Sequence, residues 1–396
     1  MEIGLVGAPN TGKSTFFNAA TLQSVETGNR PFVTIKPNQG TAYVKVECPH
    51  LDLKKKCQCV IGYCVDGKRF VPIKLWDVAG LVPNAWQGKG LGNQFLSDVM
   101  VSNALIQIID VSGKTDVEGN KTETKYENVK TQVEFLEKEI DQWMKELLKK
   151  NWGRTIKTTS SDVKSTAEQL SKNFSGLRIE TEDVKRVLAE NNFDKPDKWN
   201  EQEILKFVTL VRKKTKPMIF ACNKIDSGSG MKFFEKLKKD FPKQIFIPCS
   251  AESELALKKA NKAGLIKYIS GESDFTILKE MPESQKKALE FIKKNVLQQF
   301  NGTGVQKILN KVAFDLLNLI VAYPVQDQNK WASGKGHILP DAYLLPKGSN
   351  PVQLAFKIHT DFATRFISSI DCRTGKLIGK DTELPENAVV KINLKN

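Results

Sequence analysis

The sequence lacks an apolar run of the length that a membrane-spanning helix requires, and Met1 leads directly into a strand-like segment rather than a secretory leader. We therefore expect a cytoplasmic protein without a membrane partner. In the absence of an export signal, the seven cysteines are expected to be thiols or metal ligands rather than disulfides. No nucleophile or metal partner lies near His359 in the sequence, and we interpret this histidine as structural or recognition-related.

Acidic residues are fewer than basic ones, 45 against 60, which gives a formal net charge of +15. Such a charge favours a polyanionic partner, with RNA or a ribosome foremost. A lysine-rich proteome would produce the same charge, so net charge alone does not identify the partner. The 396 residues suffice for two or three domains. We expect a monomer, although the sequence does not determine the oligomeric state.

A glycine-rich loop near the N-terminus predicts a phosphate-binding site. Gly7–Ser14 fits the pattern G-x-x-x-x-G-K-[ST], between an apolar strand-like run and a helix-like run. Backbone N–H groups of such a loop and the dipole of the following helix attract phosphate oxygens. Lys13 would reach the β- and γ-phosphates, and the Ser14 hydroxyl would ligate Mg²⁺. The expected nucleotide contacts here are Gly7, Asn10, Thr11, Gly12, Lys13, Ser14 and Thr15.

Two later segments are expected to reach the γ-phosphate and its Mg²⁺. Thr34, in a polar segment rich in proline, is the candidate to complete the Mg²⁺ shell. Asp77 ends a predicted strand and would hold Mg²⁺ through water, while the Gly80 N–H would approach the γ-phosphate. Leu81 stands where Ras-type proteins carry a glutamine that orients the attacking water, and a leucine cannot do this. Either another group positions the water, or hydrolysis is slow until a partner acts.

The segment Asn223–Asp226 follows another apolar run and predicts recognition of guanine. A carboxylate at Asp226 would accept hydrogen bonds from the guanine N1–H and amine, and would reject adenine. Asn223 would contact and hold the glycine-rich loop Gly7–Ser14, called the P-loop below. The aliphatic part of the Lys224 side chain would pack on the base. Backbone N–H groups at Ser250 and Ala251 would meet the guanine O6. Four motifs, each at the end of a predicted strand, together favour a guanine nucleotide. They are the glycine-rich loop, Asp77–Gly80, Asn223–Asp226 and the segment with Ser250 and Ala251.

Hydrophobic periodicity divides the chain into three predicted parts. Residues 1–113 and 216–318 have the alternating strands and helices of an α/β nucleotide-binding domain. Residues 114–215 are dominated by lysine, glutamate and apolar positions at helical spacing, which indicates an inserted helical subdomain. Residues 319–396 shift to short strand-like pieces around one helix and are expected to form a separate C-terminal domain.

A group of cysteines lies between two predicted strands. Cys48, Cys57, Cys59 and Cys64 are close in sequence, and His50 follows Cys48 by two positions. Soft ligands spaced this tightly could bind Zn²⁺ tetrahedrally. The spacing is irregular, however, and C-x-C is a weaker signal than paired C-x-x-C. We therefore favour free thiols in a hairpin loop.

The motifs together resemble those of the Obg-related GTPases of the translation-factor class, specifically the YchF-like branch, in an archaeal version. The resemblance covers nearly the whole chain and rests on GAPNTGKST (Gly7–Thr15), PFVTIKPN (Pro31–Asn38), DVAGLV (Asp77–Val82), GKGLGNQFL (Gly88–Leu96), NKID (Asn223–Asp226) and IHTDF (Ile358–Phe362). It implies a Ras-like P-loop GTPase fold, a coiled helical insert, a ubiquitin-like TGS β-grasp domain at the C-terminus and association with ribosomes.

The resemblance also implies details of the site. Asn10 matches an asparagine that in related GTPases helps to hold an activating K⁺, and Leu81 matches a hydrophobic residue that replaces glutamine in this class. Some relatives have lost the base-reading aspartate and prefer ATP, but Asp226 is intact here, which favours GTP.

The resulting hypothesis is a GTPase that binds GTP or GDP with Mg²⁺ and hydrolyses GTP slowly. Lys13, Thr34 and Gly80 would serve catalysis, and Ser14, Thr34 and Asp77 would hold the metal. One alternative is a ribosome- or RNA-binding module in which nucleotide sets the conformation and turnover is negligible. A second alternative is an ATP-preferring hydrolase.

Overall fold

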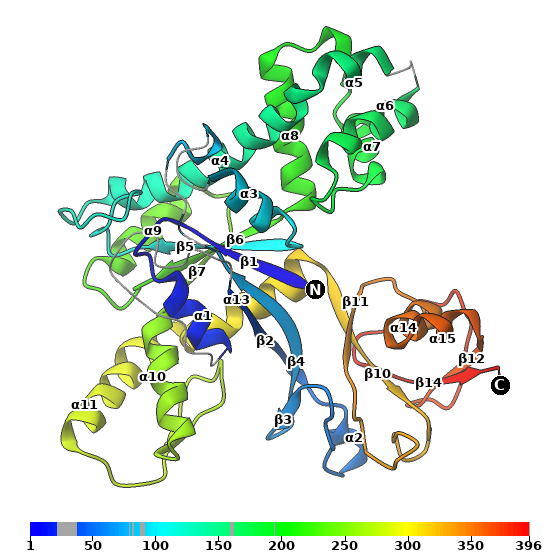
Figure 1. The fold of residues 1–396 in the computed structure, drawn as a ribbon. Coiled ribbons are helices and arrows are strands. Elements are labelled where there is room, and N and C mark those ends of the chain that lie inside the picture. The colour runs from blue at the N-terminus through cyan, green and yellow to red at the C-terminus, as the bar shows by residue number, and fades with distance from the viewer. Residues whose placement is uncertain are drawn as a thin grey trace. The chain divides into compact units, whose positions relative to one another are not determined.

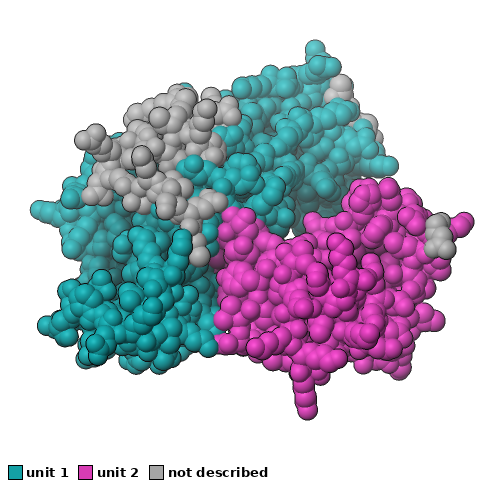
Figure 2. All heavy atoms as spheres, turned by 60° about the horizontal axis from the view of Figure 1, so that its bottom comes forward, with its two compact units in different colours: residues 1–40, 74–308 teal, residues 41–73, 309–396 magenta. Residues whose placement is uncertain are grey.

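The computed structural model describes residues 1–21, 38–78, 80, 83–87, 92–158, 162–193 and 195–395. The chain forms two compact units, coloured in Figure 2. Unit 1 consists of Met1–Gly40 and Lys74–Ile308, and unit 2 of Thr41–Ile73 and Leu309–Asn396. The sequence does not predict that residues 41–73 group with the C-terminal segment. The division into domains after residues 113, 215 and 318 stays a prediction.

Unit 1 is built on a parallel sheet with the strand order β4-β1-β5-β6-β7. The strands are β1 (Glu2–Val6), the end of β4 (Lys68–Asp77), β5 (Ala104–Asp110), β6 (Met218–Asn223) and β7 (Phe246–Pro248). Every residue of β5 and β6 is buried, as expected for parallel strands covered on both faces. Because the strands are parallel, their carboxyl ends lie at one edge.

Helices cover the two faces of this sheet, with α1 and α10 packed together on one side and α3 and α4 on the other (Figure 1). Outside the helical insertion, the helices are α1 (Lys13–Thr21), η1 (Ala85–Gln87), α3 (Gly92–Met100), α9 (Gly230–Asp240), α10 (Ala251–Lys262), α11 (Glu283–Ile292), η4 (Lys293–Leu297), α12 (Gln298–Phe300) and α13 (Val305–Lys311). A small hairpin joins β8 (Ile266–Lys267) and β9 (Thr276–Ile277).

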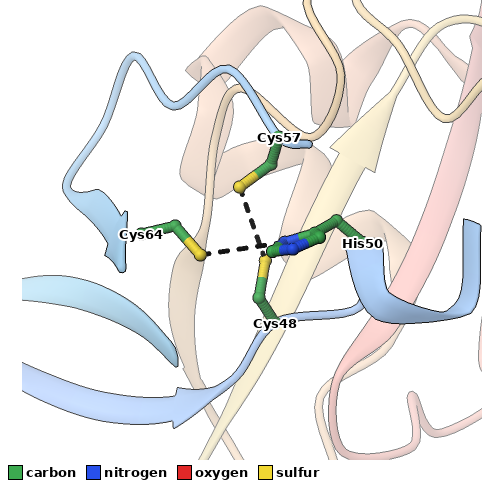
Figure 3. Close-up of side chains that lie close together, drawn as sticks. All are labelled: Cys48, His50, Cys57 and Cys64. Carbon is green, nitrogen blue, oxygen red and sulfur yellow. Dashed lines mark hydrogen bonds between the residues drawn. The ribbon is translucent and has the colours of Figure 1, made fainter. Parts of the chain in front are cut away.

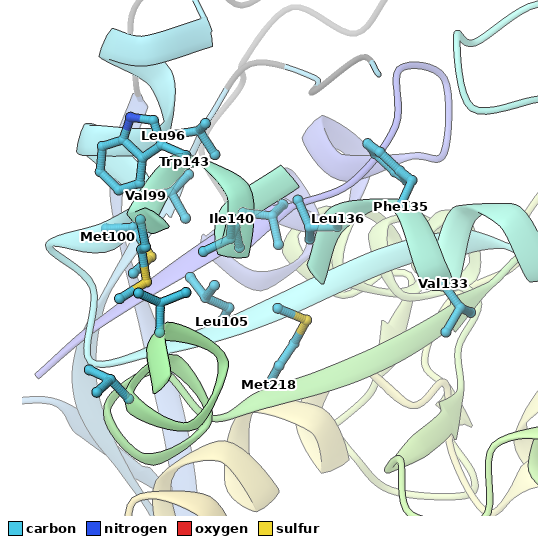
Figure 4. Packing of buried hydrophobic residues seen from close by; sticks show 14 of the residues in the cluster. Leu96, Val99, Met100, Leu105, Val133, Phe135, Leu136, Ile140, Trp143 and Met218 are labelled. Carbon is cyan, nitrogen blue, oxygen red and sulfur yellow. The ribbon is translucent and has the colours of Figure 1, made fainter. Parts of the chain in front are cut away.

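The helical insertion shares its core with the sheet. Its helices are α4 (Tyr126–Lys150), α5 (Trp152–Thr158), α6 (Val163–Ser171), η2 (Lys172–Phe174), α7 (Thr181–Glu190), η3 (Pro196–Lys198) and α8 (Glu201–Thr215). Leu136, Ile140 and Met144 of α4 belong to the same buried cluster as Leu105 and Met218 of the sheet. Figure 4 shows this packing, which attaches the first helix of the insertion directly to the nucleotide-binding core.

A buried ion pair joins α4 to α8. The Arg212 side chain is 2% exposed, and its Nε donates to Asp141 Oδ1 at 2.6 Å. Its Nη1 donates to Glu137 Oε1 at 3.1 Å, and Thr209 Oγ1 donates to Asp141 Oδ2 at 2.9 Å. Burial opposes the charge on Arg212, but the two carboxylates outweigh it and raise its pKa. The helices are therefore held by charge as well as by apolar contact.

Unit 2 contains a hairpin region and a five-stranded sheet. The first part holds β2 (Asn38–Glu47), α2 (His50–Leu53), β3 (Tyr63–Val65) and the beginning of β4, with β3 antiparallel to β4. The second part has the strand order β11-β10-β14-β12-β13. Its elements are η5 (Val312–Leu316), β10 (Leu319–Val325), β11 (Tyr343–Pro346), α14 (Pro351–Ile358), α15 (Thr360–Thr364), β12 (Phe366–Asp371), β13 (Leu377–Ile378) and β14 (Ala388–Leu394).

In the C-terminal sheet, β10 and β14 are parallel, and the remaining pairs are antiparallel. The face of the sheet that carries Ile320, Ala322 and Val390 packs on Leu354 of α14 in one apolar cluster. A mixed sheet with one packed helix matches the predicted β-grasp architecture. No helix among the described residues is long and apolar enough to span a membrane.

Arg212→Ala is expected to destabilise the insertion by about 3–5 kcal/mol, because it leaves the carboxylate of Asp141 buried without its counter-charge. The measurement is urea unfolding followed by tryptophan fluorescence. Lys214→Ala is the matched control, since Lys214 is partly exposed, its partner Glu190 is exposed, and such a pair should contribute no more than about 1 kcal/mol. An equal decrease in the free energy of unfolding in the two variants would contradict the assigned role of Arg212.

Candidate nucleotide-binding site

The loop between β1 and α1 has two positions that only glycine accommodates. Gly7 has φ of +145°, and a Cβ there would lie 2.4 Å from the backbone oxygen of Ile108. Gly12 has φ of +96°, and a Cβ there would lie 2.3 Å from Asn223 Nδ2. Backbone at such φ values is strained for residues with a side chain. The glycines therefore let the loop pass close to β5 and β6.

Within this loop, the carbonyl of Ala8 organises two side chains. It accepts hydrogen bonds from Thr11 Oγ1 and from Lys13 Nζ, each at 2.9 Å. Lys13 is 7% exposed, and burial lowers the pKa of its ammonium group to about 8, although the Asp77 carboxylate acts in the opposite direction. The following helix begins at Lys13, which places the partly exposed side chains of Ser14 and Thr15 in its first turn.

Asp77 faces the same loop from the end of β4. Its Oδ2 accepts a hydrogen bond from Ser14 Oγ at 2.9 Å. Its Oδ1 is buried and has no hydrogen-bond partner among the described residues. Burial raises the pKa of Asp77, while Lys13 and the Ser14 hydroxyl lower it. This pairing of a buried carboxylate oxygen with a serine hydroxyl matches the oxygen ligands that Mg²⁺ prefers.

Gly80 lies against the first part of the loop. A Cβ at Gly80 would approach the backbone nitrogen of Pro9 to 3.0 Å. The absence of a side chain therefore keeps this backbone close to the P-loop. Thr34 and Leu81, which the sequence assigns to the Mg²⁺ shell and to the water-positioning site, lie outside the described residues.

Asn223, the last residue of β6, connects the P-loop to the loop after β7. Its Nδ2 donates to the carbonyl of Thr11 at 2.9 Å, and its Oδ1 accepts from the Ala251 N–H at 3.0 Å. The Ala251 N–H, which is expected to meet the guanine O6, therefore bonds to Asn223 in this structure. Ser250 caps α10 through its side chain, which accepts from the N–H of Ser253.

Lys224 and Asp226 follow on the same turn. Lys224 Nζ donates to the carbonyl of Asn10 at 3.0 Å and to Asp110 Oδ2 at 2.7 Å. Asp226 is exposed, and none of the hydrogen bonds and ion pairs between described residues uses its carboxylate. The structure therefore fixes Lys224, two residues before Asp226, against the P-loop and leaves the predicted base-reading carboxylate open.

Asp110 is a site residue that the sequence analysis missed. It ends β5, is fully buried, and accepts hydrogen bonds from Ser112, Thr115 and Lys224. The signal was available, because an aspartate that ends a buried apolar strand is the same pattern that singled out Asp77. Asp110 orients Lys224 and so acts on the site through another residue.

The beginning of the predicted helical insertion also contacts the P-loop. Asn10 Nδ2 donates to the carbonyl of Gly119 at 2.8 Å. A Cβ at Gly119, whose φ is +89°, would lie 2.7 Å from Pro9 Cβ. Periodicity could not reveal this contact, because residues 113–125 form an irregular loop before α4 begins.

Three families match successive parts of the chain. They are described as 50S ribosome-binding GTPase over residues 2–152, Obg-like GTPase YGR210-like, G4 motif-containing domain over residues 221–327, and TGS domain over residues 335–393. An uncharacterized GTP-binding protein of Methanocaldococcus jannaschii is 45% identical over 98% of both chains. The chain belongs to the YchF-like branch of the Obg-related GTPases. The TGS match confirms the predicted C-terminal domain type.

Two other relatives are similar to this YchF-like GTPase over most of its length. The crystal structure of a GTP-binding protein from Pyrococcus horikoshii OT3 shares 36% identity and a TM-score of 0.79, with 100% of both chains covered. It confirms the Ras-like fold with a C-terminal TGS domain. A protein of Buchnera aphidicola named ribosome-binding ATPase YchF is 28% identical, over 92% of this chain and 86% of its own.

Nucleotide binding to this YchF-like GTPase is expected to take up protons at pH 8. The ammonium group of Lys13, with its pKa lowered to about 8 by burial, is about half deprotonated there, and a bound phosphate favours the charged form. Affinity for GDP should therefore fall as pH rises above about 8, by up to about tenfold per unit.

The measurement is calorimetric titration of GDP in buffers of different ionisation enthalpy, which gives the number of protons taken up. Lys13→Arg is the control, because an arginine stays charged throughout this range. Proton uptake that is equal in wild type and Lys13→Arg, or absent from both, would contradict the shifted pKa.

Proposed function

We propose that the protein binds GTP with Mg²⁺, hydrolyses it slowly to GDP and phosphate, and signals its nucleotide state through two switch segments in association with ribosomes. The observation that carries the proposal is the double hydrogen bond of the Asn223 amide, to Thr11 and to Ala251. This side chain ties the phosphate-binding loop to the strand ends predicted to read the base. One nucleotide could therefore contact both.

The choice of guanine rests on Asp226. Its carboxylate is exposed in the turn that follows β6, two residues after Lys224, which Asp110 and the P-loop hold in place. An aspartate in this position accepts two hydrogen bonds from guanine and finds no matching donors on the N1 edge of adenine. The YchF relatives named ATPases make ATP the specific alternative.

The proposed Mg²⁺ ligands are Ser14 and Thr34, with Asp77 acting through water. The unpartnered buried Oδ1 of Asp77 and its contact with Ser14 support this assignment. Bound Mg²⁺ would neutralise charge on the β- and γ-phosphate oxygens. In this proposal, Lys13 exchanges the Ala8 carbonyl for phosphate oxygens and stabilises their charge, and the N–H of Gly80 binds the γ-phosphate.

The proposal that hydrolysis is slow rests on Leu81. Leucine offers no hydrogen bond to an attacking water, so the water must be positioned by a partner or by another group. A K⁺ ion held near Asn10 is a candidate for this other group. The Asn10 side-chain oxygen would be its ligand, because the Nδ2 of the same amide donates to the carbonyl of Gly119. Ribosome association is proposed from the net charge of +15 and from relatives named for ribosome binding.

Asp226→Asn is expected to weaken GDP binding about 10- to 150-fold, the equivalent of about 1.5–3 kcal/mol, because charge-assisted hydrogen bonds to the base are lost. The same variant should gain affinity for xanthosine diphosphate, since an asparagine amide can donate to the xanthine C2 oxygen while its oxygen accepts from N1–H. Both affinities are measured by competition against a fluorescent GDP.

The matched control is Asp197→Asn, which removes an exposed carboxylate elsewhere in unit 1. ATP is added to the same competition. Displacement of labelled GDP by ATP as effective as that by GTP would show that Asp226 does not select guanine. It would support the ATP-preferring alternative.

Single-turnover hydrolysis of GTP is expected to be slow in Na⁺ and faster in K⁺ or with ribosomes, because the chain lacks a glutamine at position 81. Phosphate release is followed in each salt, with and without ribosomes. If phosphate is released under none of these conditions, the result would favour the alternative of a binding module, in which the bound nucleotide sets the conformation and is not hydrolysed. Lys13→Met serves as the control for contaminating hydrolases.

A further inference from the structure

Four metal-ligating side chains meet in unit 2, whereas the predicted nucleotide contacts belong to unit 1. The ligand atoms of Cys48, His50, Cys57 and Cys64 all lie within 4.8 Å of one another. Figure 3 shows the four side chains pointing toward a common centre. Cys48 follows β2 and is 2% exposed, His50 begins α2, and Cys64 lies in β3. The group is thus assembled from a strand end, a helix, a loop and a strand.

Two distances within this group match those of a tetrahedral zinc site. Bonds of about 2.3 Å to sulfur and about 2.1 Å to nitrogen place two sulfurs about 3.8 Å apart, and a sulfur and a nitrogen about 3.6 Å apart. The Cys48 and Cys57 sulfurs are 3.8 Å apart, and Cys64 Sγ lies 3.7 Å from His50 Nδ1. None of these cysteines is in a disulfide.

A second observation concerns charge. Arg69 is completely buried, and its guanidinium donates to the sulfur of Cys59 and to the carbonyls of Ile61, Leu339 and Pro340. In the described part of the chain, it forms no ion pair with a carboxylate. The half-buried carboxylate of Asp341 interacts with Arg69 only electrostatically, and a buried cation without a paired counter-charge is costly. Three thiolates and a neutral histidine around Zn²⁺ carry a net charge of −1, which would balance Arg69.

We propose that Cys48, His50, Cys57 and Cys64 bind one structural Zn²⁺ ion, with Arg69 as its charge-compensating neighbour. Four protein ligands leave no open position for substrate, so the site is structural rather than catalytic. Cys59 is not a ligand in this assignment, although its sulfur lies 3.6 Å from that of Cys57, because it accepts the hydrogen bond from Arg69. The ligand set therefore differs from the four cysteines that the sequence suggests.

The metal would fix a loop that pairs with the C-terminal part of the same unit. Between the ligands Cys57 and Cys64, the N–H of Gln58 donates to the carbonyl of Ile338 at 2.8 Å, and the N–H of Val60 donates to that of Pro340 at 2.8 Å. The carbonyl groups belong to the segment that joins β10 to β11. Zinc binding would thus hold residues 58–61 against residues 338–340 and stabilise unit 2.

The test begins with the wild-type protein, purified without chelator from zinc-supplemented cells. Elemental analysis is expected to give one zinc per chain, and cobalt exchange should give the visible absorption of a tetrahedral thiolate site. Removal of the metal by a chelator should accelerate hydrogen exchange at residues 58–61 and 338–340, and added Zn²⁺ should reverse this. A metal-free wild type that also fails to bind Co²⁺ would overturn the proposal.

Variants then test the ligand set, with GDP binding as an independent check of folding in unit 1. Cys64→Ser and His50→Asn are expected to lose zinc and the cobalt spectrum. Cys59→Ser is the matched control and should keep both, since a serine oxygen can still accept from Arg69. Loss of metal from Cys59→Ser together with retention in His50→Asn would overturn the assignment of His50 and restore the set of four cysteines.

Discussion

The geometry of the nucleotide site depends on the amide of Asn223. Its nitrogen donates to the P-loop and its oxygen accepts from the start of α10, so one buried side chain fixes the distance between two loops that are far apart in sequence. Gly12 is required for this contact, because a Cβ there would collide with Asn223 Nδ2. The parallel register of β1, β5 and β6 in turn brings both loops to one edge of the sheet. The predicted phosphate and base contacts would thus be held in a fixed relation by the Asn223 side chain.

Several buried charges in the described part of the chain lie next to an opposite charge. Asp110 meets Lys224, Arg212 meets Asp141, and Lys13 and Asp77 share one site, since an uncompensated ion in a protein interior is costly. At the P-loop the compensation is incomplete, because Asp77 retains an unpartnered oxygen and the pKa of Lys13 is lowered. Such groups gain most from a bound phosphate and its cation. Arg69 poses the same problem in unit 2, where it forms no ion pair with a carboxylate among the described residues and the cysteine ligands of the proposed zinc site would supply the balancing negative charge.

Much of the fold was predictable, because hydrophobic periodicity and strand-end motifs are local. The helices expected in residues 114–215 include α4, α7 and α8, and the short strands expected in residues 319–396 include β10, β12 and β14. Short elements in polar surroundings were missed, among them β3 and the β8–β9 hairpin, which have too few residues for a period to show. At the site, the motifs named Lys13, Ser14 and Asn223, whereas Gly119 carries no motif, and Asp110 was missed although it ends a buried strand as Asp77 does.

The sequence by itself determined the identity of the nucleotide-binding motifs and their order along a doubly covered parallel sheet, because these depend on residue types at fixed local spacing. It also placed the cysteines within one hairpin region. Only the tertiary structure decided which side chains meet. His50 replaces Cys59 in the group around Cys48, and the loop before α4 reaches the P-loop at Asn10. The physical reason is that irregular loops take their course from packing and hydrogen bonds to distant segments, which no local pattern encodes.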